Sequence, residues 1–216
     1  MEYTRVFHIL ERTSALSVLI PLGLALLKIK TFNVEMKILC LYLFICLASE
    51  VCSFIVINRG LRNYLVWHSF TVLECSLLTF IYYFRFELKK TRNIIFFVYS
   101  LFLIIAFVVL LLKGGFNKQH SILSTYESWL FISLSCSYFY KVMKELNVIK
   151  LTEDYFSWIN SAILIYFCMA FFLFLFDWHL ERSNLQTYSI LYTPHLIVNI
   201  AFNVLLFIGI WKFRGR

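Results

Sequence analysis

Five titratable side chains lie inside long apolar stretches of this chain. His68 and Glu74 lie in WHSFTVLECSLLTFIYYFR, Glu50 in LASEVCSFIVINRG, Glu127 in STYESWLF and His195 in PHLIVNIAFN. Carboxyl and imidazole groups bind protons, metal ions and polar solutes. Each ionisable group costs about 2.5–3.5 kcal/mol near the centre of a membrane helix, so such groups usually face a bundle interior or a watery cavity. These residues are therefore the first candidates for a site, provided that the surrounding segments lie in lipid.

The composition is that of a membrane protein. The 216 residues are 61% hydrophobic and 19% aromatic, with a mean hydropathy of +0.79. Charged residues make up 15% of the chain, against roughly 25% in soluble domains. The net charge of +8 is explained by basic loops that meet anionic lipid headgroups, and the sequence has no nucleic-acid-binding signature.

The apolar residues form seven blocks, each close to the roughly 20 residues that span a bilayer as a helix. Helices satisfy their own backbone hydrogen bonds in lipid, and the chain has only 6 Gly and 2 Pro to interrupt them. We therefore expect an all-α polytopic transmembrane bundle of seven helices that forms a single domain over residues 1–216. The expected helices are 14–29, 36–58, 64–84, 93–112, 121–141, 155–177 and 189–211.

The first block also has features of a signal peptide, because Arg5 and Arg12 precede a short apolar core. No small-x-small cleavage site follows it, and it ends at Lys28 and Lys30. We therefore expect a retained helix, with cleavage left open as the alternative. Pro21 predicts a kink within this helix.

The distribution of Lys and Arg predicts the orientation. Seven basic residues fall in the N-terminus and the loops on its side of the membrane, and 13 fall on the other side. Basic loops stay in the cytoplasm, so we expect the N-terminus outside and the C-terminus in the cytoplasm.

With this orientation, the candidate residues gather in the outer half of the bundle. Glu74 lies roughly 15 Å and His68 roughly 6 Å below the outer end of their helix. Their directions differ by about 120°, with Thr71 three residues from each. His195, Asn199 and Asn203 recur every four residues and form one stripe. We therefore predict an outward-facing polar pocket whose ligand-binding residues are Glu50, His68, Thr71, Glu74, Glu127, His195, Asn199 and Asn203.

Structural roles remain as alternatives for the same groups. The carboxyls also suit protonated hydrogen-bond partners between helices, the histidines suit the membrane interface, and the two asparagines suit helix packing. The sequence assigns no catalytic residue, no cofactor and no metal ligand set. The six cysteines lie in the expected spans without a CxxC pair, which favours packing roles over disulfide, redox or zinc chemistry.

Four stretches together carry a resemblance to a known group: LASEVCSF, HSFTVLECSLLTFIYYF, YFSWINSAILIYF and HLIVNIAFNVLLFIGIWKF. They resemble small seven-helix membrane proteins of Bacteroidota that occur alone or in the setting of sensor histidine kinases. The resemblance covers most of the chain beyond the first helix. It implies signal reception, a signalling partner such as a histidine kinase and a place in the bacterial cytoplasmic (inner) membrane, and it implies no catalytic residue.

Three functions remain open at this point. The first is a receptor-like sensory module that binds a small ligand, proton or metal ion and has no output domain within its loops. Neither a P-loop nor a GxGxxG pattern is present, so we expect no nucleotide-binding site. The second is a small-solute or proton-coupled transporter, since carboxyls near the midplane suit alternating access. The third is a lipid-acting intramembrane enzyme that uses Glu74 or Glu127 with His68 or His195, although no HExxH pattern supports it.

Overall fold

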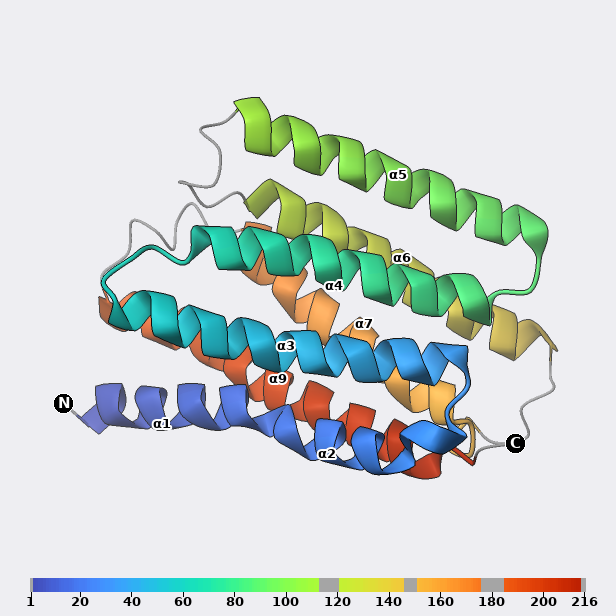
Figure 1. Cartoon of the computed structure of the whole chain (residues 1–216), viewed down its shortest axis with the longest axis horizontal. Coiled ribbons are helices and arrows are strands. Elements are labelled where there is room, and N and C mark those ends of the chain that lie inside the picture. Colours follow the sequence, from blue (N-terminus) through green and yellow to red (C-terminus); the bar gives the residue numbers. More distant parts are fainter. Residues whose placement is uncertain (1, 113–120, 146–150, 176–184, 215–216) are drawn as a thin grey trace. The chain divides into compact units, whose positions relative to one another are not determined.

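A computed structural model describes residues 2–112, 121–145, 151–175 and 185–214, and within them all regular structure is helical. Figure 1 shows the helices and their labels. Their bounds are α1 Glu2–Ser17, α2 Leu19–Lys28, the 3₁₀ turn η1 Ile29–Thr31, α3 Val34–Asn58, α4 Tyr64–Arg85, α5 Lys89–Leu112, α6 Ser121–Glu145, α7 Tyr155–Leu175 and α9 Leu185–Lys212.

The prediction of an all-α seven-helix membrane fold is confirmed, with α1 and α2 forming one broken helix. Six helical segments in the described parts of the chain are long and apolar enough to cross a membrane: Val6–Thr31, Val34–Asn58, Tyr64–Arg85, Lys89–Val109, Tyr155–Leu175 and Ser189–Lys212. The remaining helix, α6, has 25 residues, but its serines and Glu127 lower its hydropathy. The orientation remains a prediction.

The helix bounds agree with those expected from the sequence to within four residues, except at the N-terminus. The first helix was expected from residue 14, but α1 begins at Glu2. That expectation was wrong because it followed hydropathy, and the charged residues Arg5, Glu11 and Arg12 lower the hydropathy before residue 14 without ending the helix. Residues 176 and 177, expected at the end of the sixth helix, lie outside the described residues.

The chain separates into two compact units. Unit 1 contains residues 1–25 and 128–214, and therefore α1, most of α2, most of α6, α7 and α9. Unit 2 contains residues 26–127 with 215–216, and therefore α3, α4, α5 and the first turns of α6. The single-domain expectation remains a prediction.

The break between α1 and α2 at Val18 follows from Pro21. Proline has no N–H, so the carbonyl of Ser17, four residues earlier, receives no helical hydrogen bond from it. The helix resumes where Leu22 N donates to Val18 O at 3.2 Å. The helical hydrogen bonds are thus interrupted just before Pro21, and the kink itself remains a prediction.

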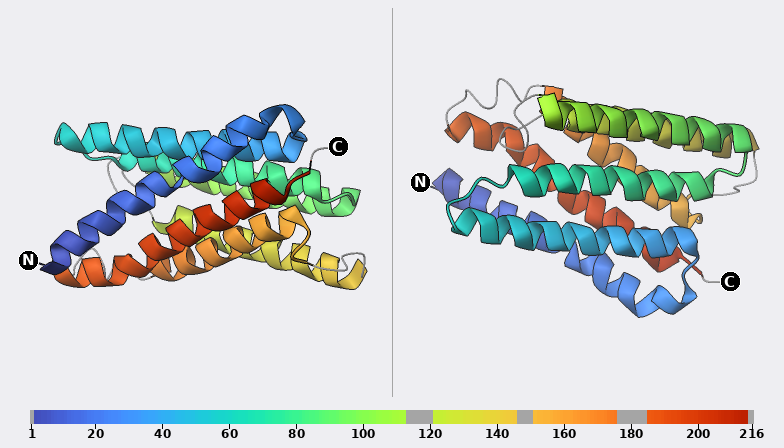
Figure 2. Two further views of the ribbon diagram at one scale, coloured as in Figure 1. Left: turned by 90° about the horizontal axis from the view of Figure 1, so that it is seen from below. Right: turned by 45° about the horizontal axis from the view of Figure 1, so that its top comes forward.

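In unit 2, α3 and α4 form an antiparallel hairpin (Figure 2). Asn33 Oδ1 accepts from Met36 N at 3.0 Å and caps the start of α3. At its end Gly60 has φ 71°, and Leu61 N donates to Val56 O at 3.1 Å. This left-handed glycine closes the last turn and lets the chain return into α4.

In unit 1, one carboxylate ties the start of α7 to α6. Asp154 Oδ2 accepts from Ser157 N at 2.9 Å and from the Tyr138 hydroxyl of α6 at 2.6 Å. The first hydrogen bond caps α7, and the second fixes α6 beside that cap. Trp158 Nε1 also donates to Thr152 O at 2.9 Å, which holds the residues before the helix.

Helices α7 and α9 run side by side and antiparallel, and they approach closely at Gly209 (Figure 2). A Cβ built on Gly209 would lie 2.7 Å from Ile159 Cγ1 and 3.1 Å from the Tyr155 carbonyl oxygen. The ring of Tyr155 meets that of Phe213 edge-on at 4.9 Å, one turn further along. A glycine is therefore required at this position for the two helix backbones to pack.

Replacing Gly209 with alanine should lower the stability of the folded protein by about 1–3 kcal/mol, because the added methyl group overpacks the α7–α9 contact. Thermal unfolding followed by circular dichroism in detergent measures this effect. The matched control is Gly23→Ala in α2, where a Cβ meets nothing within 4 Å. Equal unfolding temperatures for the two variants would contradict the close approach.

Candidate functional site

The first feature of the site is a buried hydrogen bond between α3 and α4. Glu74 lies at the middle of α4 and is 5% exposed. The hydroxyl of Tyr42 on α3, itself 2% exposed, donates to Glu74 Oε1 at 2.7 Å. The apolar residues around both side chains keep them in the interior of the helix pair, so this bond joins two spans inside the membrane region.

The second feature is another buried carboxyl in the same unit. Glu127 lies in the first turns of α6, is 3% exposed and interacts electrostatically with Glu74. We call Glu74 and Glu127 the carboxyl pair. Glu127 Oε1 has no hydrogen-bond partner among the described residues. Buried polar atoms without partners are uncommon, so this oxygen points to a missing proton donor or occupant. Thr79 of α4 is also buried and lies beside Cys75.

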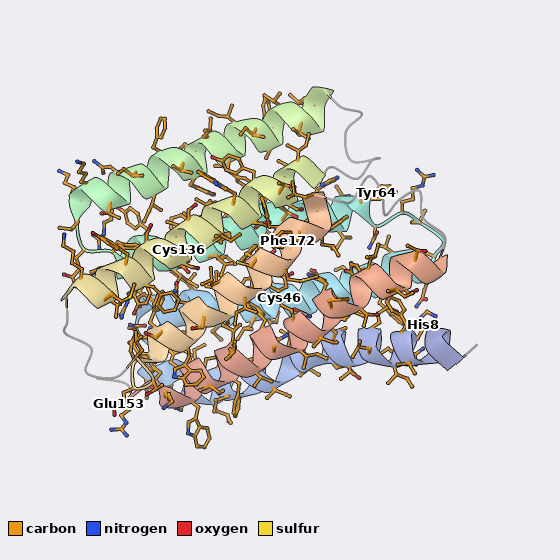
Figure 3. The ribbon with its side chains drawn as sticks, turned by 180° about the vertical axis from the view of Figure 1, so that it is seen from behind. His8, Cys46, Tyr64, Cys136, Glu153 and Phe172 are labelled. Atoms are coloured by element: carbon orange, nitrogen blue, oxygen red, sulfur yellow. The ribbon has the colours of Figure 1, made fainter. Side chains whose placement is uncertain are left out.

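No basic side chain of the described residues forms an ion pair with the carboxyl pair. An exposed ion pair elsewhere, on α1, joins His8 to Glu11, with Nδ1 and Oε2 3.2 Å apart. Figure 3 labels His8 near the start of that helix. No lysine or arginine in the described parts of the chain therefore neutralises Glu74 or Glu127 through a direct ion pair.

Two cysteines border the carboxyl pair. Cys75 is fully buried beside Glu74 on α4 and lies within electrostatic reach of Glu127. Cys46, labelled in Figure 3, lies one turn beyond Tyr42 on α3 and within reach of Glu74. All six cysteines of the chain have free thiols, and Cys52 and Cys136 are exposed rather than packed in the interior.

The surroundings of the carboxyl pair differ on its two sides along the membrane. Toward the start of α4 the buried residues are polar, namely His68 and Thr71, each 4% exposed. Toward the end of α4, large apolar side chains pack tightly between α4 and the antiparallel first half of α3. These are Met36, Leu39, Leu43, Leu78, Ile81 and Tyr82, each at most 1% exposed. The buried residues toward the start of α4 are thus polar, whereas those toward its end form a mainly apolar layer, the apolar seal, with Thr79 as its buried polar exception.

Glu50 does not share this environment. It lies on α3, two turns beyond Tyr42 and in line with it, but its side chain is exposed. The buried residues of α3 end at Leu43, so no described side chain from Phe44 to Asn58 is buried. Glu50 and Tyr42 therefore lie on the same face of α3, but one side chain is exposed and the other is buried. The predicted ligand-binding role of Glu50 remains a prediction.

The asparagine stripe of α9 lies in unit 1 and bonds to α1. Asn199 Nδ2 donates to Ser14 Oγ at 2.9 Å, and Asn203 Nδ2 donates to Ser17 Oγ at 2.8 Å. We call these four residues the asparagine seam. Asn203 Nδ2 also donates to the Asn199 carbonyl oxygen at 3.0 Å. The seam joins two helices through neutral polar groups, which suits packing inside a membrane.

His195 continues the same stripe one turn before Asn199 and is 8% exposed. Its ring lies 5.4 Å from that of Tyr166 on α7 and 5.2 Å from that of Tyr192 on α9. Its Nδ1 has no hydrogen-bond partner among the described residues. His195 is therefore held by aromatic packing, with one ring nitrogen unsatisfied.

The structure thus groups the predicted residues into two sets. Unit 2 contains Glu50, His68, Thr71, Glu74 and Glu127, and unit 1 contains His195, Asn199 and Asn203. No group of three or more His, Cys, Asp or Glu side chains suited to a metal ion was found among the described residues.

Sequence reasoning missed several contributors to these sets. Tyr42 was not recognised as the donor to Glu74, and Thr79 was not singled out. The serines of the asparagine seam were also missed, although Ser14 and Ser17 have the i, i+3 spacing of one helix face. This spacing was the signal in the sequence from which Ser14 and Ser17 could have been identified.

Comparison with models of known protein families, with characterised proteins and with solved structures found no match.

Loss of one bond of the asparagine seam should have a small, coupled effect on stability. Asn203→Ala and Ser17→Ala remove the two partners of the 2.8 Å bond. Side-chain hydrogen bonds in membrane bundles average about 0.6 kcal/mol, so we expect a coupling energy of about that size in a double-mutant cycle. The measurement is reversible unfolding of the four proteins in mixed micelles.

The uncoupled control combines Asn203→Ala with Ser100→Ala on α5. The Ser100 hydroxyl donates to the Phe96 carbonyl oxygen of its own helix at 2.8 Å, so its loss should add to that of Asn203 without coupling. Strictly additive effects of the Asn203 and Ser17 substitutions would contradict a stabilising bond.

Proposed function

We propose that this multi-pass membrane protein is a receptor-like sensory module whose working site is the carboxyl pair. In this proposal a small ligand, proton or metal ion reaches Glu74 and Glu127 and changes the packing of α3 and α4. A membrane or cytoplasmic partner then responds to that change. The resemblance to small seven-helix proteins of Bacteroidota supports a histidine kinase as the partner and the bacterial inner membrane as the location.

The observation that carries the proposal is the unsatisfied Oε1 of Glu127 beside Glu74. A carboxyl that served only to join helices would be expected to use its oxygens in interhelical hydrogen bonds, as Glu74 does with Tyr42. Glu127 instead occupies a costly buried position without that compensation. A functional role for Glu127 explains the energetic cost of its burial better than a role in packing does.

The apolar seal favours a receptor over a transporter. A transported solute or proton must leave the site on the side opposite to its entry, which requires a polar route on both sides. Toward the start of α4 the buried residues include His68 and Thr71, whereas Leu43, Leu78 and Tyr82 pack toward its end, where Thr79 is the polar exception. A site with a single polar approach supports binding and release on the same side.

The proposal predicts that the charge of Glu74 controls packing around Cys75. An ionised carboxylate draws water into a helix bundle, and a buried thiol reacts only where water can reach it. Glu74→Gln removes the charge and should therefore slow the modification of Cys75. We expect about a tenfold decrease in rate, equivalent to about 1.4 kcal/mol in the opening equilibrium. The measurement uses a membrane-permeant maleimide on protein in lipid bilayers, with Cys75 as the only cysteine.

Two controls accompany this measurement. Glu50→Gln removes an exposed carboxyl and should leave the Cys75 rate unchanged. In a second single-cysteine protein, the exposed Cys52 should react equally fast with and without the Glu74→Gln substitution. Equal Cys75 rates in wild type and Glu74→Gln would contradict the proposal. Net proton or solute flux in proteoliposomes that stops in Glu74→Gln would replace the receptor with a transporter.

A further inference from the structure

We infer that the occupant of the carboxyl pair is a proton, carried by Glu127, while Glu74 is the ionised member that Tyr42 stabilises. This inference rests on the proposed function, because it names what the same site binds. It follows from the charges, hydrogen bonds and burial around the two carboxyls.

The charge balance of the surrounding helices requires at least one proton. On α3 the titratable groups that face the carboxyl pair are Tyr42 and Cys46, and on α4 the neighbouring thiol is Cys75. His68 is on α4 about 9 Å away along the helix axis. None of these supplies a permanent positive charge.

The remaining helices of unit 2 add no cation. Tyr126 of α6 donates its hydroxyl to the Val98 carbonyl oxygen of α5, and the Tyr99 hydroxyl of α5 is bonded to Ser76 Oγ. The basic residues of α3, α4 and α5 stand in the first or last turns of these helices, namely Lys37, Arg85, Lys89, Lys90 and Arg92. Two ionised carboxyls would therefore repel each other in a desolvated interior without compensation, which is far costlier than one.

The hydrogen bonds decide which member holds the proton. Glu74 Oε1 accepts from Tyr42 at 2.7 Å, and a donor of this kind stabilises a carboxylate. Glu127 Oε1 has no donor among the described residues. An ionised Glu127 would leave a charged oxygen buried without a partner, whereas a neutral acid loses much less on burial. The proton therefore resides on Glu127.

Thr79 adds a polar group but no charge to this interior. Its hydroxyl is buried and lies beside the Cys75 thiol on the same face of α4. Neither group supplies a positive charge that would stabilise a second carboxylate.

Infrared difference spectroscopy of the full-length protein in lipid bilayers tests the assignment at neutral pH. Protonated carboxylic acids give a carbonyl band that carboxylates lack, so wild type should show this band for a buried acid. We expect Glu127→Gln to abolish it and Glu74→Gln to keep it. Glu50→Gln identifies any contribution from the exposed carboxyl of α3. Glu127→Asp keeps a carboxylic acid and should shift the band without removing it. This variant also serves as a control that the site tolerates substitution.

Three results would overturn the inference. The first is wild type without the band, and the second is a band that persists in Glu127→Gln but disappears in Glu74→Gln. The third is a band that appears only when sodium or potassium is withdrawn, which would assign a metal cation to the site. None of these results depends on the Cys75 modification rates. If those rates respond to Glu74→Gln while the band is absent, the receptor-like site stands and its occupant is not a proton.

Discussion

Hydrocarbon offers no hydrogen bonds, and the polar side chains of this bundle are arranged by that constraint. Each buried polar group must find a partner on another helix, turn back to its own backbone, or remain unsatisfied at a cost. The asparagine seam takes the first route between α1 and α9, and Tyr42 with Glu74 takes it between α3 and α4. Thr71 takes the second by donating to the Trp67 carbonyl oxygen at 3.1 Å.

The few groups that take neither route are therefore informative. Glu127 and His195 each have one buried atom without a partner among the described residues. Glu127 belongs to unit 2 and borders Cys75, whereas His195 lies among tyrosine rings in the other unit. The receptor proposal depends on the unsatisfied oxygen of Glu127, which interacts electrostatically with a second buried carboxyl, Glu74. A single unsatisfied histidine nitrogen supports no comparable argument.

The sequence predicts the helices well because hydropathy and helix length are local properties. The expected spans 36–58 and 64–84 agree closely with Val34–Asn58 and Tyr64–Arg85. Partners across helices are not local, and the sequence predicts them poorly. The spacing of Asn199 and Asn203 shows a polar stripe, but nothing near them identifies Ser14 and Ser17. Likewise, the helical phase places Glu50 on the same face of α3 as Tyr42. Burial depends in addition on where the neighbouring helices end, which the phase does not show.

The asparagine seam also constrains how the protein is assembled. Its hydrogen bonds join residues 185 and 186 positions apart, so α1 meets its partner only when α9, the last helix described, has been synthesised. Until then Ser14 and Ser17 must rely on their own backbone, as Ser17 does by donating to the Ser14 carbonyl oxygen at 2.6 Å. Contacts of such long sequence separation form late, because the intervening chain must be ordered first. Completion of unit 1 therefore waits for the synthesis of α9, and truncation before α9 leaves the first helix without this partner.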